Sequence, residues 1–299
     1  MYDNQGFRTD LALERNEFLR ENNSGEIETQ EYFKDKVRIT RLKIKTKEES
    51  ELLGKPVGTY ITAEVPSFAT DAEVFDGRLE VIADEIRSLL PKEGLVLIVG
   101  LGNELITPDA LGPKCIDFVL ATRHISSELA QAIGLGNLRA VAGISPGVLG
   151  QTGIETGEII AGVSRNIKPS AIITVDALAS RKLSRLGCTV QISDTGITPG
   201  SGVGNSRKSI NKELLGVDVI SIGVPTVVDG ETLAYDLLGE ELVNKEDVRE
   251  IISPEGKRMV VTPREIDVMI ERASRLVGMA INRALHPEIS CEDILSLVT

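Results

Sequence analysis

Short, continuous apolar runs recur along the chain, separated by segments with helical spacing. The apolar runs are 95–100, 140–142, 171–175, 189–192 and 217–224. Such runs are typical of strands that are buried on both faces of a parallel sheet. Helical patterns lie between several of them, for example at 112–121 and 126–133. This alternation predicts an α/β fold with a doubly wound, mostly parallel sheet and helices on both faces.

A different pattern precedes the first apolar run. Residues 37–45 alternate between two faces, and together with 57–65 they predict an additional, smaller β-rich portion near the N-terminus. Residues 78–90 have apolar side chains at helical spacing and stop at Pro91, which predicts a helix there. No internal repeat or linker interrupts the chain, so we expect one α/β domain.

The two ends of the chain differ in character. Residues 1–35 are polar and charged, and they predict a mobile N-terminal arm, over about 11–35, with a short helix near 11–20. Residues 262–285 have the spacing of a long amphipathic helix, and 292–298 predict a second, short helix.

Composition narrows the classes of function. The 299 residues include 33 Lys and Arg against 45 Asp and Glu, for a net charge of −12. Such an acidic chain disfavours contact with nucleic-acid phosphates and with anionic membranes. No apolar run approaches the roughly 18 residues of a membrane span, and the start lacks the pattern of a signal peptide. We therefore expect a cytoplasmic protein that binds neither nucleic acid nor membrane.

The chain has few of the side chains on which many hydrolytic sites depend. Cys115, Cys188 and Cys291 are scattered, which is typical of free thiols and not of a disulfide frame or a zinc site. His124 and His286 are the only histidines. With two histidines, the chain has few side chains from which to form a Ser-His-Asp triad or a histidine-rich metal centre. The sequence therefore predicts no cofactor and no metal.

Two aspartates stand where an open α/β sheet forms its sites, beyond the carboxyl ends of strands. Asp109 comes after the run that ends at Gly100, and Asp176 directly follows the run 171–175. Taken alone, each aspartate is more simply a capping residue of a helix or a loop. Taken together, two close carboxylates share a proton, so that one acts as base on a water molecule and the other as acid.

Gly-rich segments frame this proposed cleft, at 145–157 and 198–205. They predict either ordinary surface loops or a peptide-binding or gating element. The basic residues near them are Arg181, Lys182, Arg207 and Lys208. In an acidic protein, these side chains either read acidic groups on a substrate or form an ordinary solvated face.

Several motifs resemble those of the germination protease family, endopeptidases of endospore-forming bacteria. They are Arg8–Glu14, Thr107–Pro113, Val175–Arg181 and Ser193–Ile197. A more distant similarity links 99–103 to hydrogenase maturation endopeptidases, which share the fold. The resemblance, which runs from about residue 7 to about residue 285, implies that Asp109 and Asp176 are the two catalytic carboxylates of an aspartic-type peptidase.

The resemblance also implies how the enzyme is made and regulated. Family members are inactive zymogens that remove a short N-terminal peptide by self-cleavage. By analogy the cut falls between Asp10 and Leu11, which gives a propeptide over 1–10 and a single peptidase domain over 11–299. Substrates of the family are cut after an acidic residue and before a hydrophobic residue and Ala, with Glu close behind. Residues 11–14, Leu-Ala-Leu-Glu, fit that pattern.

The expected substrates are small acid-soluble spore proteins, in the spore core, and the expected assembly is a homotetramer. Two other classes of function stay open. Metal-assisted hydrolysis, as in hydrogenase maturation enzymes, would need Asp109 to meet His124 or His286. A non-catalytic nucleotide-binding module would use the turn that contains Gly100 and Gly102, although a glycine pair after a strand is a weak signal.

Overall fold

The computed structural model describes residues 7–73, 76–132, 135–136, 138–200, 208–238 and 259–298. Its strands are β1 (Thr29–Lys34), β2 (Val37–Ile44), β3 (Gly58–Glu64), β4 (Val96–Gly100), β5 (Val141–Ile144), β6 (Ala171–Ser180), β7 (Thr189–Ser193), β8 (Asp218–Asp229) and β9 (Val260–Val261). Its helices are α1 (Ala12–Glu21), α2 (Lys47–Leu53), α3 (Gly77–Leu89), α4 (Leu111–Ile116), α5 (Ser127–Ala132), α6 (Leu149–Thr152), α7 (Thr156–Ile167), α8 (Lys212–Leu215), α9 (Gly230–Leu238), α12 (Ile266–Leu285) and α13 (Cys291–Val298). Short 3-10 turns are η1 (Thr107–Asp109) and η2 (Leu183–Arg185).

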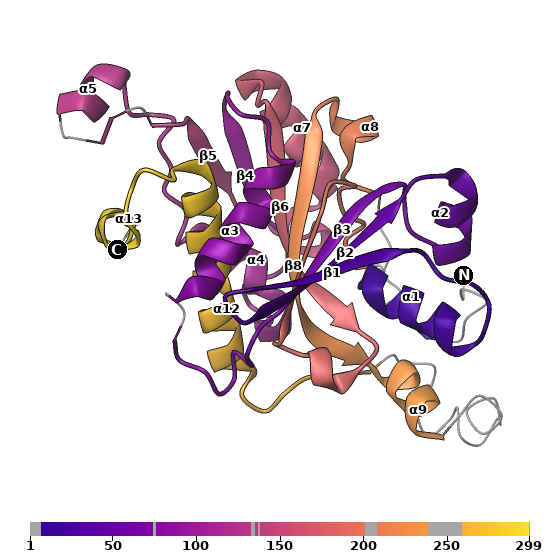
Figure 1. The fold of residues 1–299 in the computed structure, drawn as a ribbon. Helices are drawn as coiled ribbons and strands as arrows, with labels where there is room; N and C mark the ends of the chain where they lie inside the picture. Colours follow the sequence, from indigo (N-terminus) through magenta and orange to yellow (C-terminus); the bar gives the residue numbers. More distant parts are fainter. Residues whose placement is uncertain are drawn as a thin grey trace.

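The strands form one mixed sheet in the order β1-β2-β3-β7-β8-β6-β4-β5, with β9 beside β8 (Figure 1). Strands β8, β6, β4 and β5 are parallel to one another. Strand β7 runs antiparallel to β8, and β3, β2 and β1 continue as an antiparallel meander. The predicted α/β class is confirmed, and the small N-terminal β portion extends the same sheet instead of forming a separate one.

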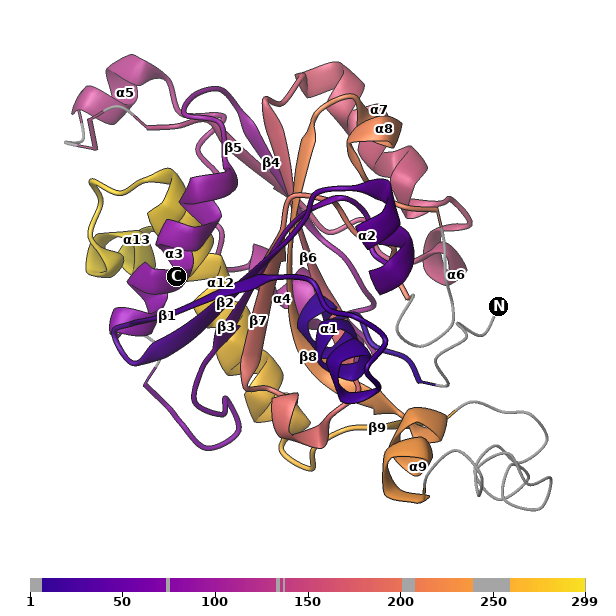
Figure 2. The ribbon, with the colours of Figure 1, turned by 45° about the vertical axis from the view of Figure 1, so that its right-hand side comes forward.

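Helices cover both faces of the sheet, as alternate side chains of β4 illustrate. Val96 and Ile98 join the cluster of buried side chains that includes α3, α4 and α12. Leu97 and Val99 face the opposite way and join the cluster with α7 and the end of α8. Helices α1 and α2 cover the antiparallel half on that second side (Figure 2). A continuous apolar strand is therefore buried on both faces, as predicted from its sequence.

Residues of the expected arm are packed into this architecture. The helix predicted near 11–20 is α1, and residues that follow it form β1, the edge strand that pairs with β2. Leu11 and Ala12 have exposed fractions of 0%. Asn16 ties the helix to the chain that follows, because its side chain both donates to Ile27 O at 2.8 Å and accepts from Ile27 N–H at 2.6 Å. The start of the arm is thus part of the core.

Strands β4, β6 and β8 run toward the same edge of the sheet. Strand β4 ends at Gly100, opposite Val175, whereas β6 and β8 continue side by side beyond this point. Turn η1 and helix α4 cross this edge directly after β4. Parallel strands place their carboxyl ends on one side, so this edge is where a site is expected. Among the described residues, every helix is too short or too polar to cross a lipid bilayer.

Candidate active site

The two predicted catalytic aspartates line one cavity of about 290 Å³ at this edge. Asp176 belongs to β6, opposite Gly223 of β8, and only 5% of it is exposed. Its Oδ1 accepts a hydrogen bond from the N–H of Ala177 at 2.9 Å. Asp109 is the last residue of η1, and its Oδ2 accepts from the N–H of Asn103 at 2.7 Å. Backbone donors thus orient both carboxylates.

Three glycines allow the chain segments that carry these aspartates to approach each other. A Cβ on Gly100 would lie 2.2 Å from the carbonyl oxygen of Gly112, and one on Gly112 would lie 2.4 Å from that of Val175. A Cβ on Gly102 would lie 2.0 Å from the carbonyl oxygen of Asp109. The glycine pair after β4 therefore has a packing reason, because it lets η1 and α4 rest on the strand ends.

Gly102→Ala should reduce activity by displacing Asp109. Gly102 has φ +115, so an alanine there is strained and also collides with backbone. We expect the free energy of unfolding to fall by about 1–3 kcal/mol, measured in urea, with a clear loss of peptidase activity. Gly216→Ala is the matched control, since Gly216 has φ +74 but nothing lies near its Cβ position. Equal activity losses in the two variants would contradict this role for Gly102.

Asp10, which precedes the predicted self-cleavage bond, lines the same cavity as Asp109 and Asp176. Its N–H donates to the carbonyl of Ala179, and its Oδ2 accepts from the N–H of Ala179, both at 2.8 Å. Ala179 lies three residues after Asp176 on β6. The residue before the bond is therefore attached to the same strand that supplies one of the two candidate catalytic carboxylates.

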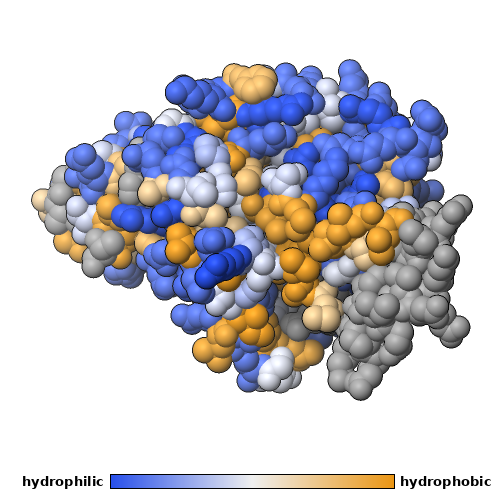
Figure 3. All heavy atoms as spheres, turned by 90° about the horizontal axis from the view of Figure 1, so that it is seen from below, coloured by the Kyte–Doolittle hydropathy of each residue, from blue (hydrophilic) through white to orange (hydrophobic). Residues whose placement is uncertain are grey.

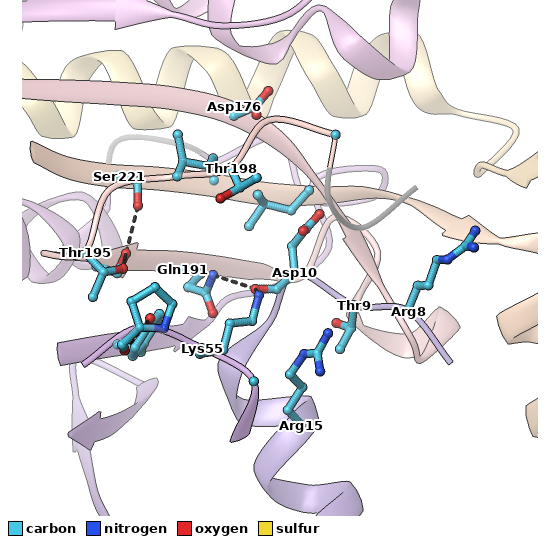
Figure 4. Close-up of a pocket in the computed structure, with 18 of the residues that line it drawn as sticks. Arg8, Thr9, Asp10, Arg15, Lys55, Asp176, Gln191, Thr195, Thr198 and Ser221 are labelled. Atoms are coloured by element: carbon cyan, nitrogen blue, oxygen red, sulfur yellow. Dashed lines mark hydrogen bonds between the residues drawn. The ribbon is translucent and has the colours of Figure 1, made fainter. Parts of the chain in front are cut away.

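A second, adjoining cavity of about 400 Å³ is also lined by Asp10 and Asp176 (Figure 4). Arg8, Arg15 and Lys55 contribute positive charge to its wall. The same wall carries the carboxylates of Asp229 and Glu231, and Arg8 pairs with Asp229 at 3.4 Å, so charges of both signs line this cavity. The sequence reading did not find Arg15 or Lys55, because neither belongs to a recognisable motif.

Comparison with known proteins places the chain in a family. The family model described as "Germination protease" matches residues 8–246 and 237–297. The chain belongs to the germination protease family. A germination protease of Caldanaerobacter subterraneus subsp. tengcongensis is 43% identical, with 98% of each chain covered. Those of Clostridium tetani and Priestia megaterium are 40% and 37% identical, over 97% and 96% of this chain and 98% and 95% of theirs.

A solved structure of a hydrogenase maturation protease is also similar to the chain. It is the [NiFe] hydrogenase maturation protease HycI from Thermococcus kodakarensis KOD1, at 16% sequence identity. The match covers 66% of this chain and 98% of that chain, with a TM-score of 0.37. Membership of the germination protease family rests on the sequence matches alone.

Two of the four predicted basic substrate-binding residues of this family member, Arg181 and Lys182, contact carboxylates of α1 and α9. Arg181 Nε donates to Asp236 at 2.8 Å, and its Nη1 donates to Glu21 at 3.2 Å. Lys182 Nζ donates to Glu17 at 2.9 Å. Both cations thus pair with carboxylates of the chain, two of which lie on α1 and one on α9. Their role in substrate binding stays a prediction.

Helix α1 is anchored beyond the predicted cut by Glu14, whose side chain is fully buried. Its carboxylate accepts from the N–H of Arg181 at 2.6 Å and from the N–H of Lys182 at 2.9 Å. Burial raises the pKa of Glu14, while hydrogen bonds from Thr9 and the two amides act in the opposite direction. The glutamate of the substrate-like motif therefore has a structural partner, the segment that follows β6.

The Gly-rich segments approach the cavity only in part. Gly147, Val148 and Thr156 line the smaller cavity together with Pro199 and Gly200. Residues 201–207, including the predicted Arg207, lie outside the described residues, and Lys208 is exposed. Figure 3, which views the molecule from below, shows apolar side chains gathered on this side. Two exposed apolar residues, Ile106 (53% exposed) and Val260 (47% exposed), belong to the cavity wall.

Neither alternative site gains support from the described part of the chain. Within it, no three His, Cys, Asp or Glu side chains stand close enough to hold a metal ion. His124 is exposed, whereas His286 is buried at the end of α12, where burial lowers its pKa to about 4. The turn with Gly100 and Gly102 is filled by the backbone around Asp109 and Gly112, so it lacks the open cradle of a phosphate site.

Proposed function

We propose that the chain is an aspartic-type endopeptidase that activates a water molecule between Asp109 and Asp176. The observation that supports this is that both carboxylates line one cavity with Asp10. Close carboxylates titrate as a pair, because two negative charges at short range disfavour each other. The ionised member removes a proton from water, and the protonated member donates one to the departing amine.

We further propose that the enzyme is made as a zymogen with residues 1–10 as its propeptide. The bond from Asp10 to Leu11 leads into α1, and Leu11 itself has extended backbone angles of φ −80° and ψ 120°. Residues 7–10 line the larger cavity, so they occupy space that a substrate needs. A tethered segment has an effective concentration of about 1 mM, enough to block a groove even when it binds weakly.

The proposed substrates are small acid-soluble spore proteins, cleaved after an acidic residue. The hydrogen bond from the N–H of Ala179 to the Asp10 carboxylate supports an acidic residue at that position. The exposed apolar side chains of Ile106 and Val260 in the smaller cavity suit the hydrophobic residue that follows. As parts of the same proposal, the enzyme works in the spore core as a homotetramer, without a cofactor, a nucleic acid or a membrane as partner.

The experiment that tests this function is cleavage of a small acid-soluble spore protein by the purified full-length chain. Products are mapped by mass spectrometry over time, together with the N-terminus of the enzyme. Cleavage after acidic residues, preceded by loss of residues 1–10, is the expected result. Cleavage by a chain that still begins at Met1 would contradict the zymogen, and cleavage after non-acidic residues would contradict the proposed specificity.

Alkylation of cysteines should leave peptidase activity unchanged. Cys115 is fully buried, and burial raises the pKa of its thiol and also that of the Cys291 thiol, so neither is a ready nucleophile. The measurement is the rate of substrate cleavage before and after iodoacetamide, with circular dichroism to detect unfolding. Loss of activity in a folded, alkylated enzyme would show that a thiol takes part.

A further inference from the structure

Two side chains hold the carbonyl oxygen of Asp10, and neither belongs to the aspartate pair. Lys55 Nζ donates to this oxygen at 2.9 Å, and Gln191 Nε2 donates at 3.1 Å. Gln191 also accepts, through Oε1, a hydrogen bond from the N–H of Ala12 at 2.8 Å. Gln191 therefore contacts the peptide group of the Asp10–Leu11 bond and also the peptide group that follows it. Figure 4 shows the first of these contacts.

The fold fixes the side chain of Gln191 and the backbone of Lys55 before any reaction begins. Lys55 follows Gly54, which ends α2 in a left-handed conformation at φ 67°, and the carbonyl of Lys55 accepts from Ser50 Oγ at 2.7 Å. Gln191 lies within β7, hydrogen-bonded between β3 and β8, and is only 8% exposed. Donors held in this way lose little entropy when they bind a developing charge.

We propose that Lys55 and Gln191 form the oxyanion site of this peptidase. The proposal rests on the proposed cut between Asp10 and Leu11. Water oxygen bonds to the carbonyl carbon of Asp10 while one carboxylate of the pair takes a proton from the water. The electron pair of the C=O bond moves onto the oxygen, where the ammonium of Lys55 and the N–H of Gln191 stabilise the negative charge.

Collapse of this intermediate restores the C=O bond and breaks the bond from carbon to the nitrogen of Leu11. The second carboxyl group of the pair supplies the proton that the departing amine needs, so charge and protons balance. Once residues 1–10 have left, Lys55 and the Nε2 of Gln191 face the place of the Asp10 carbonyl. A substrate that binds there with its own acidic residue presents its carbonyl to the same donors.

The positions of the residues in the cavity support separate roles for the carboxylate pair and for the two donors. Asp10 lies between Asp176 on one side and the two donors on the other (Figure 4). Lys55 lines the larger cavity together with Asp10 and Asp176, and Gln191 lines it as well. In the proposed step, water activated by the carboxylate pair attacks the carbonyl carbon while Lys55 and Gln191 hold the carbonyl oxygen.

The test is the first-order rate at which the full-length chain loses residues 1–10, followed by mass spectrometry. Lys55→Met and Gln191→Glu should each slow this step by about a hundredfold, which is typical of the loss of one oxyanion donor. Gln191→Glu retains an oxygen that accepts from Ala12, but it replaces the donor with a negatively charged oxygen beside the carbonyl. Lys55→Arg should recover part of the rate. Lys43→Met, a change at an exposed lysine of β2, is the control.

A purely structural role makes a different prediction. If Lys55 only anchors the arm, Lys55→Met should release residues 7–12, which hydrogen exchange detects as lost protection. Slow cleavage with the arm still protected supports the oxyanion role. Cleavage within about threefold of wild type, well under 1 kcal/mol of barrier, or slow cleavage with a detached arm, would overturn it.

Failure of the proposed function is visible separately in the same assay. A cut at a bond other than Asp10–Leu11 would remove the basis of both proposals. Full activity in Asp176→Asn would refute the carboxylate pair, yet the comparison of Lys55→Met with Lys43→Met would still report on the oxyanion donor. Cleavage of a spore-protein peptide by the matured variants extends the test, with a lower kcat and little change in KM as the expected result.

Discussion

Asp109→Asn and Asp176→Asn should each slow cleavage of a spore-protein substrate by about a thousandfold, within the range of general acid–base catalysis. Neither substitution changes side-chain volume, and both retain an oxygen for the backbone donors at Asn103 and Ala177. What each removes is a carboxylate that exchanges a proton. The measurement is kcat/KM on a peptide substrate and the rate of self-cleavage in the full-length chain.

The matched control for these variants is Asp117→Asn, at an exposed aspartate just beyond α4. It should keep wild-type activity. Circular dichroism and urea unfolding establish that all three variants are folded. If Asp109→Asn or Asp176→Asn stayed within about tenfold of wild type, about 1.4 kcal/mol of barrier, the pair would not be the catalyst.

Asp10→Ala should slow removal of the N-terminal peptide by about a hundredfold, as loss of a charged hydrogen-bonding group in a specific subsite does. The substitution removes the acceptor for the N–H of Ala179 and a negative charge from the cavity that Arg15 and Lys55 also line. Asp10→Asn separates the two effects, because it retains an acceptor and loses the charge. Mass spectrometry of the N-terminus over time measures the rate.

Asp10→Glu is the conservative control and should retain most of the rate, since an acidic side chain remains. The competing interpretation is that Asp10 only caps α1, but the N-cap of that helix is Leu11, without a side-chain cap, and Asp10 Oδ2 bonds to Ala179. If Asp10→Ala lost its N-terminal peptide at the wild-type rate, Asp10 would not be the residue that the site recognises.

Much of the fold follows from patterns of apolar residues, because strands and helices have different periods. The run at 171–175 became β6, and the predicted helix at 262–285 became α12. Strand direction does not follow from such runs, so the antiparallel course of β7 was not predicted. The helix expected over 112–121 ends at Ile116, since the backbone N–H of Leu120 instead bonds to the side chain of Asn282 on α12.

The site was predictable only where an acidic residue follows an apolar run, although Asp176 lies within β6 and not at its end. Asp109 and Asp176 are acidic residues after apolar runs, and the structure brings them to one cavity. The ion-pair partners of Arg181 could not be predicted, because they lie on α1 and α9, far away along the chain. Gln191 is detectable in the sequence as a polar residue inside the apolar run 189–192. Lys55 had none, because its position depends on the end of α2.

The contacts of residues 7–10 have a consequence for the timing of activation. Phe7 packs on Phe18 with 4.4 Å between ring centroids, and Arg8 N–H donates to Thr232 Oγ1 at 2.9 Å. These contacts, like those of Asp10 with Ala179, do not depend on the bond to Leu11. Hydrolysis therefore leaves a severed peptide still seated in its groove. Activity then depends on dissociation, so dilution should raise the fraction of cut enzyme that is active, and added peptide should lower it.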